Sequence, residues 1–240
     1  MTDPPLAGAR IVVTRPPGTE VRLVSELEAL GADVAVVPLV DVREADSRAL
    51  DAAFEEERDW IVFTSANGVR AVGERLHRAG RARFAAVGPA TAAALRDVGV
   101  EPAFVPDRFA ADAISDGLGK LAGARVLLPQ ADIADPALAD ELRARSAVVE
   151  ALVAYRTVAI EPDERGLEAL RGADVILLAS GSAARALASV SLPLERALVA
   201  CIGPKTAREA AVAGLQVRLV AEEATVDGMI RALVSHFGER

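Results

Sequence analysis

The chain has 240 residues, of which 52% are hydrophobic and 26% charged, and its formal net charge is −8. This composition is typical of a folded protein with one large domain or two small ones. A single cysteine excludes an internal disulfide, and with two histidines it leaves too few ligands for a zinc or iron–sulfur site.

The acidic balance disfavours a protein that binds nucleic acid. No stretch of 18 apolar residues lacks charges, and the first ten residues do not resemble a signal peptide. We therefore expect a cytoplasmic protein that makes no use of a membrane or of nucleic acid.

Short β-rich runs alternate with helical patterns along the first half of the chain. This alternation predicts parallel sheets covered by helices on both faces. The expected strands and helices are, in chain order, Ile11–Thr14, Glu20–Leu30, Val34–Val42, Trp60–Thr64, Asn67–Arg78, Phe84–Val87, Thr91–Val98, Ala103–Val105 and Ala110–Leu121.

The second half of the sequence repeats the first at a constant offset of 115 residues, without a gap. Ser65 is equivalent to Ser180, and the run Gly88-Pro89-Ala90-Thr91-Ala92 is equivalent to Gly203-Pro204-Lys205-Thr206-Ala207. A shared apolar rhythm is common among α/β segments, whereas a constant offset that carries Gly-Pro-x-Thr-Ala indicates duplication. Each copy is predicted to be a small doubly wound α/β domain.

Two of the predicted strands are too long for one small domain. The runs Val34–Val42 and Val148–Ile160 have 9 and 13 residues, which correspond to roughly 30–43 Å of extended chain. Pro38 is tolerated only at an edge or a bulge, so we expect the outer half of the first run to leave its parent sheet. The two overhangs are equivalent in the repeat and could pair between domains, so the domain boundary is predicted to run through them.

Small polar turns follow the predicted strands, where ligands of open parallel sheets bind. Backbone N–H groups and helix dipoles at such turns suit carboxylates or phosphates. The same residue types are also the preferred N-caps of helices, and capping is the favoured interpretation for Ser65, Thr91 and Ser180 taken singly. The turns are Thr14–Gly18, Thr64–Gly68, Gly88–Thr91, Ser180–Ser182 and Gly203–Thr206.

Four polar residues in these regions differ between the two copies. Lys205 stands at a helix start, where a cation opposes the macrodipole, so an anionic ligand would explain it. Divergence by drift is the alternative for each of them. The four pairs are Arg15 with Gln130, Asn67 with Ser182, Lys205 with Ala90, and Tyr155, the single tyrosine, with Val40.

The sequence gives little support for a dinucleotide-binding site, a P-loop or a reactive cysteine. No Gly-x-Gly-x-x-Gly follows a strand, and the turn at Gly203 lacks the glycine spacing of a phosphate-binding P-loop. Cys201 lies in an apolar run and is predicted to be a small core residue.

Five segments together resemble the uroporphyrinogen-III synthase family, and the resemblance covers essentially the whole chain. The sequence departs from the family pattern at Gln130, where Arg is frequent, at Ser146, where Gly is usual, and at Ala179, where Thr is expected. The matching segments are Ile11-Val12-Val13-Thr14-Arg15-Pro16, Phe63-Thr64-Ser65-Ala66-Asn67-Gly68-Val69, Ala86-Val87-Gly88-Pro89-Ala90-Thr91-Ala92, Ala154-Tyr155-Arg156-Thr157 and Cys201-Ile202-Gly203-Pro204-Lys205-Thr206-Ala207.

The resemblance implies two similar doubly wound, flavodoxin-like or Rossmann-like domains with parallel sheets, joined by a two-stranded β ladder. The expected domains are residues 1–37 with 158–240, and residues 44–151, with 38–43 and 152–157 as linker strands. It also implies a monomeric hydro-lyase of tetrapyrrole biosynthesis, without metal or organic cofactor. The enzyme would close linear hydroxymethylbilane to uroporphyrinogen III with inversion of the last ring, with a possible transient contact to the preceding deaminase.

The resemblance further implies the site. Tyr155 is similar in place to a family tyrosine that is proposed to protonate the departing hydroxyl, and Thr206 matches a family threonine of the Gly-Pro-x-Thr turn. A noncatalytic binding protein or sensor for an acidic metabolite stays open, whereas 3% aromatic residues disfavour a flavodoxin-like redox protein. The expected substrate-binding residues are Arg15, Ser65, Asn67, Thr91, Ser180, Gly181, Ser182, Lys205 and Thr206.

Overall fold

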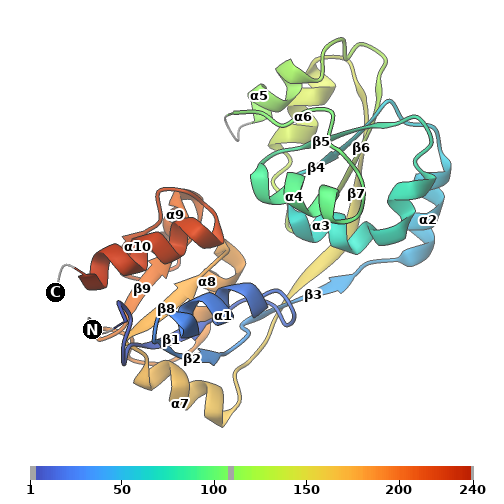
Figure 1. Ribbon diagram of the computed structural model, residues 1–240. Coiled ribbons are helices and arrows are strands. Elements are labelled where there is room, and N and C mark those ends of the chain that lie inside the picture. Colours follow the sequence, from blue (N-terminus) through green and yellow to red (C-terminus); the bar gives the residue numbers. More distant parts are fainter. Residues whose placement is uncertain (1–3, 108–110, 239–240) are drawn as a thin grey trace. The chain divides into compact units, whose positions relative to one another are not determined.

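The computed structural model describes residues 4–107 and 111–238, and the chain forms two compact units (Figure 1). The first unit comprises Met1–Asp41 and Val158–Arg240, and the second comprises Val42–Thr157. The first unit is therefore discontinuous in sequence, and the second is inserted into it.

The first unit is a five-stranded parallel sheet with helices on both faces. Helices α7, α8 and α9 pack on one face through Leu170, Leu187 and Ala210, and α1 and α10 pack on the other. The strand order is β10-β9-β8-β1-β2. The bounds are β1 (Arg10–Val13), α1 (Val21–Ala29), β2 (Asp33–Val36), α7 (Glu164–Gly172), β8 (Val175–Leu178), α8 (Gly181–Ser189), β9 (Leu198–Cys201), α9 (Pro204–Val212), β10 (Val217–Val220) and α10 (Val226–Gly238).

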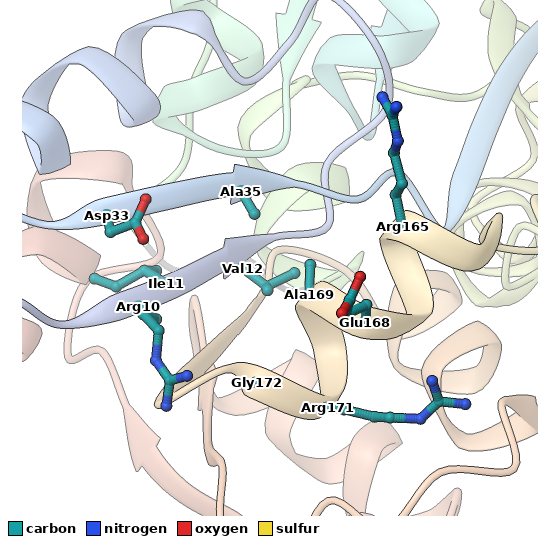
Figure 2. Close-up of a pocket in the computed structure, with 10 residues that line it drawn as sticks. All are labelled: Arg10, Ile11, Val12, Asp33, Ala35, Arg165, Glu168, Ala169, Arg171 and Gly172. Atoms are coloured by element: carbon teal, nitrogen blue, oxygen red, sulfur yellow. The ribbon is translucent and has the colours of Figure 1, made fainter.

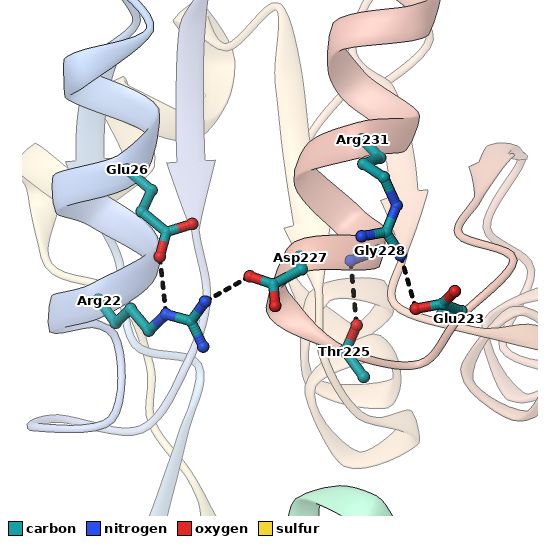
Figure 3. A network of polar contacts seen from close by, with 7 residues as sticks. All are labelled: Arg22, Glu26, Glu223, Thr225, Asp227, Gly228 and Arg231. Atoms are coloured by element: carbon teal, nitrogen blue, oxygen red, sulfur yellow. Dashed lines mark hydrogen bonds and ion pairs between the residues drawn. The ribbon is translucent and has the colours of Figure 1, made fainter.

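Side chains from the two ends of the sequence meet in this unit. Figure 3 shows Arg22 of α1 between Glu26 of the same helix, at 2.7 Å, and Asp227 of α10. The same two helices contribute Leu27 of α1 and Leu233 of α10, which are fully buried in one core. Because exposed ion pairs contribute about 0–1 kcal/mol, the apolar contacts carry most of the stability of this face.

The second unit has a similar architecture, except that its edge strand β3 runs antiparallel to the other four strands. Helices α2, α3 and α4 with the short η1 cover one face of its sheet, and α5 and α6 cover the other. The strand order is β3-β7-β6-β4-β5. The bounds are β3 (Val40–Glu44), α2 (Ser47–Glu55), β4 (Trp60–Phe63), α3 (Ala66–Val72), η1 (Gly73–Arg78), β5 (Arg83–Ala86), α4 (Pro89–Asp97), α5 (Ala111–Gly117), β6 (Arg125–Ala131), α6 (Ala137–Ala144) and β7 (Val148–Ala159).

The strand registers confirm the duplication. Ile11 pairs with Val175 in the first sheet, and Trp60 pairs with Val126 in the second. Val126 lies 115 residues after Ile11 and Val175 lies 115 residues after Trp60, so the two pairs are equivalent. The prediction that each copy is itself a domain is wrong, however, because every sheet combines strands of both copies.

The first of the two long runs is not one strand. β2 ends at Val36 and β3 begins at Val40 in the other sheet, because Pro38 has no N–H to donate and interrupts the ladder. This confirms that the outer half of the run leaves its parent sheet. The second run is confirmed as β7, which spans 12 residues.

β3 lies beside β7, as expected for the two overhangs. The N–H of Ala45 donates to the carbonyl of Ala154 at 3.1 Å, and the N–H of Ile160 donates to that of Leu39 at 2.9 Å. Along this pair, residue numbers increase in one strand as they decrease in the other, so the strands run antiparallel.

Three smaller predictions need correction. The helix expected over Asn67–Arg78 changes at Gly73, which has φ 56, into the 3₁₀ segment η1. The strand expected over Ala103–Val105 is reduced to one bridge between Ala85 and Phe104. The helix expected over Ala110–Leu121 is α5, which ends at Gly117, and residue 110 lies outside the described residues.

Ser146 adopts a left-handed backbone with φ 65, and its repeat equivalent Gly31 has φ 91. A residue with a Cβ is destabilised by about 1–2 kcal/mol in the left-handed conformation. Glycine avoids this steric cost but loses more backbone entropy on folding, which offsets part of the gain. We expect Ser146→Gly to raise the free energy of unfolding in urea by about 0.5–1 kcal/mol. Gly31→Ser is the reverse control and should lower it, because a Cβ there would lie 2.8 Å from that of Pro4. A loss of stability in Ser146→Gly would contradict this account.

Candidate functional site

Two helices of the second unit begin at the carboxyl edge of its sheet. Ser65 follows β4 and caps α3, because its Oγ accepts the N–H of Gly68 at 3.1 Å. α4 begins at Pro89 and its N-cap is the extended Gly88, so the predicted capping role of Thr91 is wrong. Thr91 instead lies in the first turn of α4, 5% exposed. Since β4 and β5 are parallel neighbours, both helix N-termini lie at the same edge of this sheet.

Tyr155 of β7 reaches this edge through an irregularity in its strand. Gln130 pairs with Val153 and Ala131 with Tyr155, so Ala154 is an extra residue, which forms a β-bulge. The Tyr155 hydroxyl lies 2.8 Å from Ser65 Oγ, and the residue is 6% exposed. The structure thus brings together two of the residues that the sequence predicts for the site.

The environment of Tyr155 raises its pKa. Burial is the main cause and the negative charge of Asp132 adds to it, whereas the hydrogen bond with Ser65 lowers the pKa. The phenol therefore keeps its proton at neutral pH, where it can act as a donor.

This pKa can be measured directly because the chain has a single tyrosine. We expect the ultraviolet absorbance of the phenolate to appear with a midpoint above the ordinary value of about 10. Far-ultraviolet circular dichroism over the same pH range shows whether the fold persists. A midpoint at or below the ordinary value in the folded protein would contradict the burial of this phenol.

The first unit repeats the arrangement at the carboxyl edge of its own sheet. Ser180 caps α8 by accepting the N–H of Ala183 at 3.2 Å, and its Oγ lies 3.0 Å from that of Ser182. Thr206 lies in the first turn of α9 and is 7% exposed, and the neighbouring Lys205 is exposed. Capping is thus confirmed for Ser65 and Ser180, which are equivalent in the repeat.

Gly181 lies close to a side chain of the next helix. A Cβ there would lie 1.7 Å from Oε2 of Glu209 on α9, and that carboxylate pairs with Arg185 at 2.5 Å. Because this carboxylate is the end of a flexible side chain, it could move aside, so the contact alone does not require glycine at this position.

Two further predicted residues make local contacts. Arg15 follows β1, and its Nε lies 3.5 Å from Oγ1 of Thr19 in the same turn. Asn67 is half-buried in the first turn of α3, and its Oδ1 accepts from Arg70 at 3.1 Å. The predicted residues therefore form two groups, each at one sheet's carboxyl edge: Ser65, Asn67, Thr91 and Tyr155 in the second unit, and Arg15, Ser180, Gly181, Ser182, Lys205 and Thr206 in the first.

A cavity of about 550 Å³ lies elsewhere in the first unit (Figure 2). Its lining comes from α7 and from β1 and β2, with Val12, Ala35 and Ala169 as small apolar side chains. None of the predicted site residues lines it. The cavity therefore adds nothing to the candidate site.

The remaining interpretations concern Cys201, metals and membranes. Cys201 is fully buried, as predicted, and burial raises the pKa of its thiol to about 11. Within residues 4–107 and 111–238, no three His, Cys, Asp or Glu side chains are grouped as metal ligands would be. Over the same residues, no helix is long and apolar enough to span a membrane.

Comparison with known proteins identifies relatives along the whole chain. The family described as uroporphyrinogen-III synthase HemD matches residues 21–231. The uroporphyrinogen-III synthase of Synechococcus elongatus is 28% identical over 97% of both chains. The porphyrin biosynthesis protein HemD of Ruminiclostridium josui is 30% identical over 96% of this chain, which spans about half the length of that relative.

Two solved structures have a similar fold. A mutant uroporphyrinogen III synthase from Thermus thermophilus gives a TM-score of 0.66 at 20% identity and covers 97% of this chain and 100% of its own. The uroporphyrinogen-III synthetase of Helicobacter pylori gives 0.66 at 18% identity, with 95% and 99% covered. At these identities the likeness shows the two-domain α/β fold alone.

Proposed function

Because the chain belongs to the uroporphyrinogen-III synthase family, its reaction is the cyclisation of hydroxymethylbilane, and we propose which residues carry it out. The linear substrate loses its terminal hydroxyl as water and closes to uroporphyrinogen III with the last pyrrole ring inverted. Departure of the hydroxyl consumes one proton, and ring closure later releases one. The protein therefore needs a proton donor and a means to orient the last ring.

Tyr155 is the proposed donor. The contact of 2.8 Å between its hydroxyl and Ser65 Oγ is the observation that carries this assignment. Ser65 already accepts the N–H of Gly68, and its Oγ can donate to the phenol oxygen while the phenol proton points at the leaving group. A positioned acid of this kind contributes about 10²–10⁴ in rate.

The other predicted residues are proposed to bind the substrate carboxylates. The substrate carries eight carboxylates, and the first turns of α3, α4, α8 and α9 present backbone N–H groups that suit anions. Lys205 and Arg15 supply positive charge, and the hydroxyls of Thr206, Thr91 and Ser182 supply hydrogen bonds. Asn67 and Ser180 complete the set, and the backbone of Gly181 contributes its N–H.

These contacts are proposed to orient the last ring rather than to activate it. The substrate closes spontaneously to the uninverted isomer, so its pyrroles need little covalent assistance. Holding the substituted ring position against the cationic methylene is a positioning effect worth several kcal/mol, or about 7–11 kcal/mol at best. Because this energy is spread over many contacts, most single substitutions should weaken activity without abolishing it.

We also propose that the enzyme works as a cytoplasmic monomer, with a transient contact to the preceding deaminase. Because the substrate closes spontaneously to the uninverted isomer, a short transfer time between the two enzymes would limit that loss. The alternative function is a noncatalytic binding protein for an acidic metabolite, which could use the same turns. Consumption of hydroxymethylbilane by the purified chain separates the two: acceleration over spontaneous closure supports the enzyme, and binding without acceleration supports the alternative.

A further inference from the structure

The bulge in β7 determines where the Tyr155 side chain goes. In a regular strand, consecutive side chains point to opposite faces, so Ala154 and Tyr155 would not share a core. Here both belong to the same buried cluster, at 0% and 6% exposure. The extra residue therefore turns the phenol toward α3 and Ser65.

Asp132 holds β7 directly after this bulge. Its backbone N–H donates to the carbonyl of Tyr155 at 3.1 Å, and its Oδ1 accepts the N–H of Thr157 at 3.3 Å. The carbonyl of Ala154 is bonded on the other edge by the N–H of Ala45. One residue just beyond β6 thus fastens β7 at the Tyr155 carbonyl and at the Thr157 N–H, both directly after the extra residue Ala154.

We propose that Asp132 is a positioning residue, which holds the bulge of β7 so that the Tyr155 hydroxyl stays within reach of Ser65. The inference rests on the proposed role of Tyr155 as the acid. Comparison of the copies supports it independently, because Asp132 is equivalent to Pro17 and Tyr155 to Val40. The acid that fastens the strand and the tyrosine that it positions occur together in one copy and are both absent from the other.

The experiment uses the full chain with Asp132→Ala, Asp132→Asn and a matched control, Asp135→Ala. Asn keeps an Oδ1 acceptor for Thr157 and removes the charge, whereas Ala removes both. Asp135 is also exposed and also accepts a backbone N–H, that of Ala137 at 2.9 Å, but it does not hold β7. Circular dichroism first establishes that each variant is folded.

We expect Asp132→Ala to lower kcat about ten-fold or more with KM within about two-fold. The reason is that the variant misplaces the proton donor and leaves the substrate-binding contacts in place. Its Tyr155 titration midpoint should fall, since the phenol becomes more exposed and loses the facing carboxylate. Asp132→Asn should restore kcat to within about two-fold of wild type, and Asp135→Ala should leave kcat and the titration unchanged.

Wild-type kcat with an unchanged titration in Asp132→Ala would overturn the proposal. An Asp132→Asn enzyme as slow as Asp132→Ala would also overturn it. The hydrogen bond from the Thr157 N–H to the side chain at position 132 would then not be what positions Tyr155. If Tyr155→Phe keeps full activity while Asp132→Ala still shifts the tyrosine titration, the acid role of Tyr155 fails and the positioning of its ring by Asp132 stands.

Discussion

Tyr155→Phe is expected to lower kcat by about a hundred-fold, which is the lower end of the contribution of a positioned proton donor. The phenyl ring keeps the apolar packing in the core of the second unit, and only the hydroxyl is removed. Loss of its hydrogen bond with Ser65 should cost about 1 kcal/mol of unfolding free energy. Single-turnover kinetics with hydroxymethylbilane, read beside urea unfolding, separates the loss of activity from that of stability.

The isomer composition of the residual product tests the same variant further. With the carboxylate contacts intact, the slower enzyme should still form mainly the type III isomer, diluted by type I from spontaneous closure. Turnover equal to wild type would remove the acid role from Tyr155. A stable variant that forms type I faster than spontaneous closure would instead give this residue the steering role that we assign to many contacts.

Ser65→Ala is expected to have the second largest effect, and Ser180→Ala is its matched control. Both lose the cap of an equivalent helix, which should cost each about 1 kcal/mol of unfolding free energy, and Ser65→Ala should lose about 1 kcal/mol more with its hydrogen bond to Tyr155. Only Ser65→Ala also removes the partner of Tyr155, so it should lower kcat about ten-fold. Ser180→Ala should act mainly on KM, because Ser180 contacts Ser182 and Ala183 and not the proposed proton donor.

The tyrosine titration distinguishes the two serine variants without any substrate. The hydrogen bond with Ser65 lowers the pKa of Tyr155, so its removal should raise the titration midpoint, and Ser180→Ala should leave it unchanged. Equal midpoints in Ser65→Ala and wild type would contradict the contact. A complete loss of activity in a stably folded Ser65→Ala variant would contradict steering by many contacts.

Much of the fold follows from local signals in the sequence. The constant offset predicts two similar domains, and a proline in an apolar run predicts that the strand changes sheets at Pro38. The exchange of strands between the copies follows from the two overlong runs. By contrast, the change at Gly73 and the single bridge at Phe104 depend on packing, because short apolar runs do not reveal whether a neighbouring strand is available.

The candidate site is less accessible to sequence reasoning. Capping by Ser65 and Ser180 is visible in the residue types, but Thr91 lies inside its helix because Gly88 and Pro89 begin α4. The contact between Ser65 and Tyr155 joins residues 90 positions apart and depends on a bulge, which no periodicity reveals. The role of Asp132 was not predicted for the same reason. The difference between Asp132 and its repeat equivalent Pro17 is the one sequence feature that could have indicated it.

The most direct test of the account is the isomer ratio that the purified protein produces. Hydroxymethylbilane is supplied to the enzyme, the product is oxidised, and the type III and type I porphyrins are separated and quantified against an incubation without protein. We expect type III to predominate with wild type and the type III fraction to fall in Tyr155→Phe and Ser65→Ala. A product that is type I at the proportion found without protein would contradict the assignment of these residues to the cyclisation.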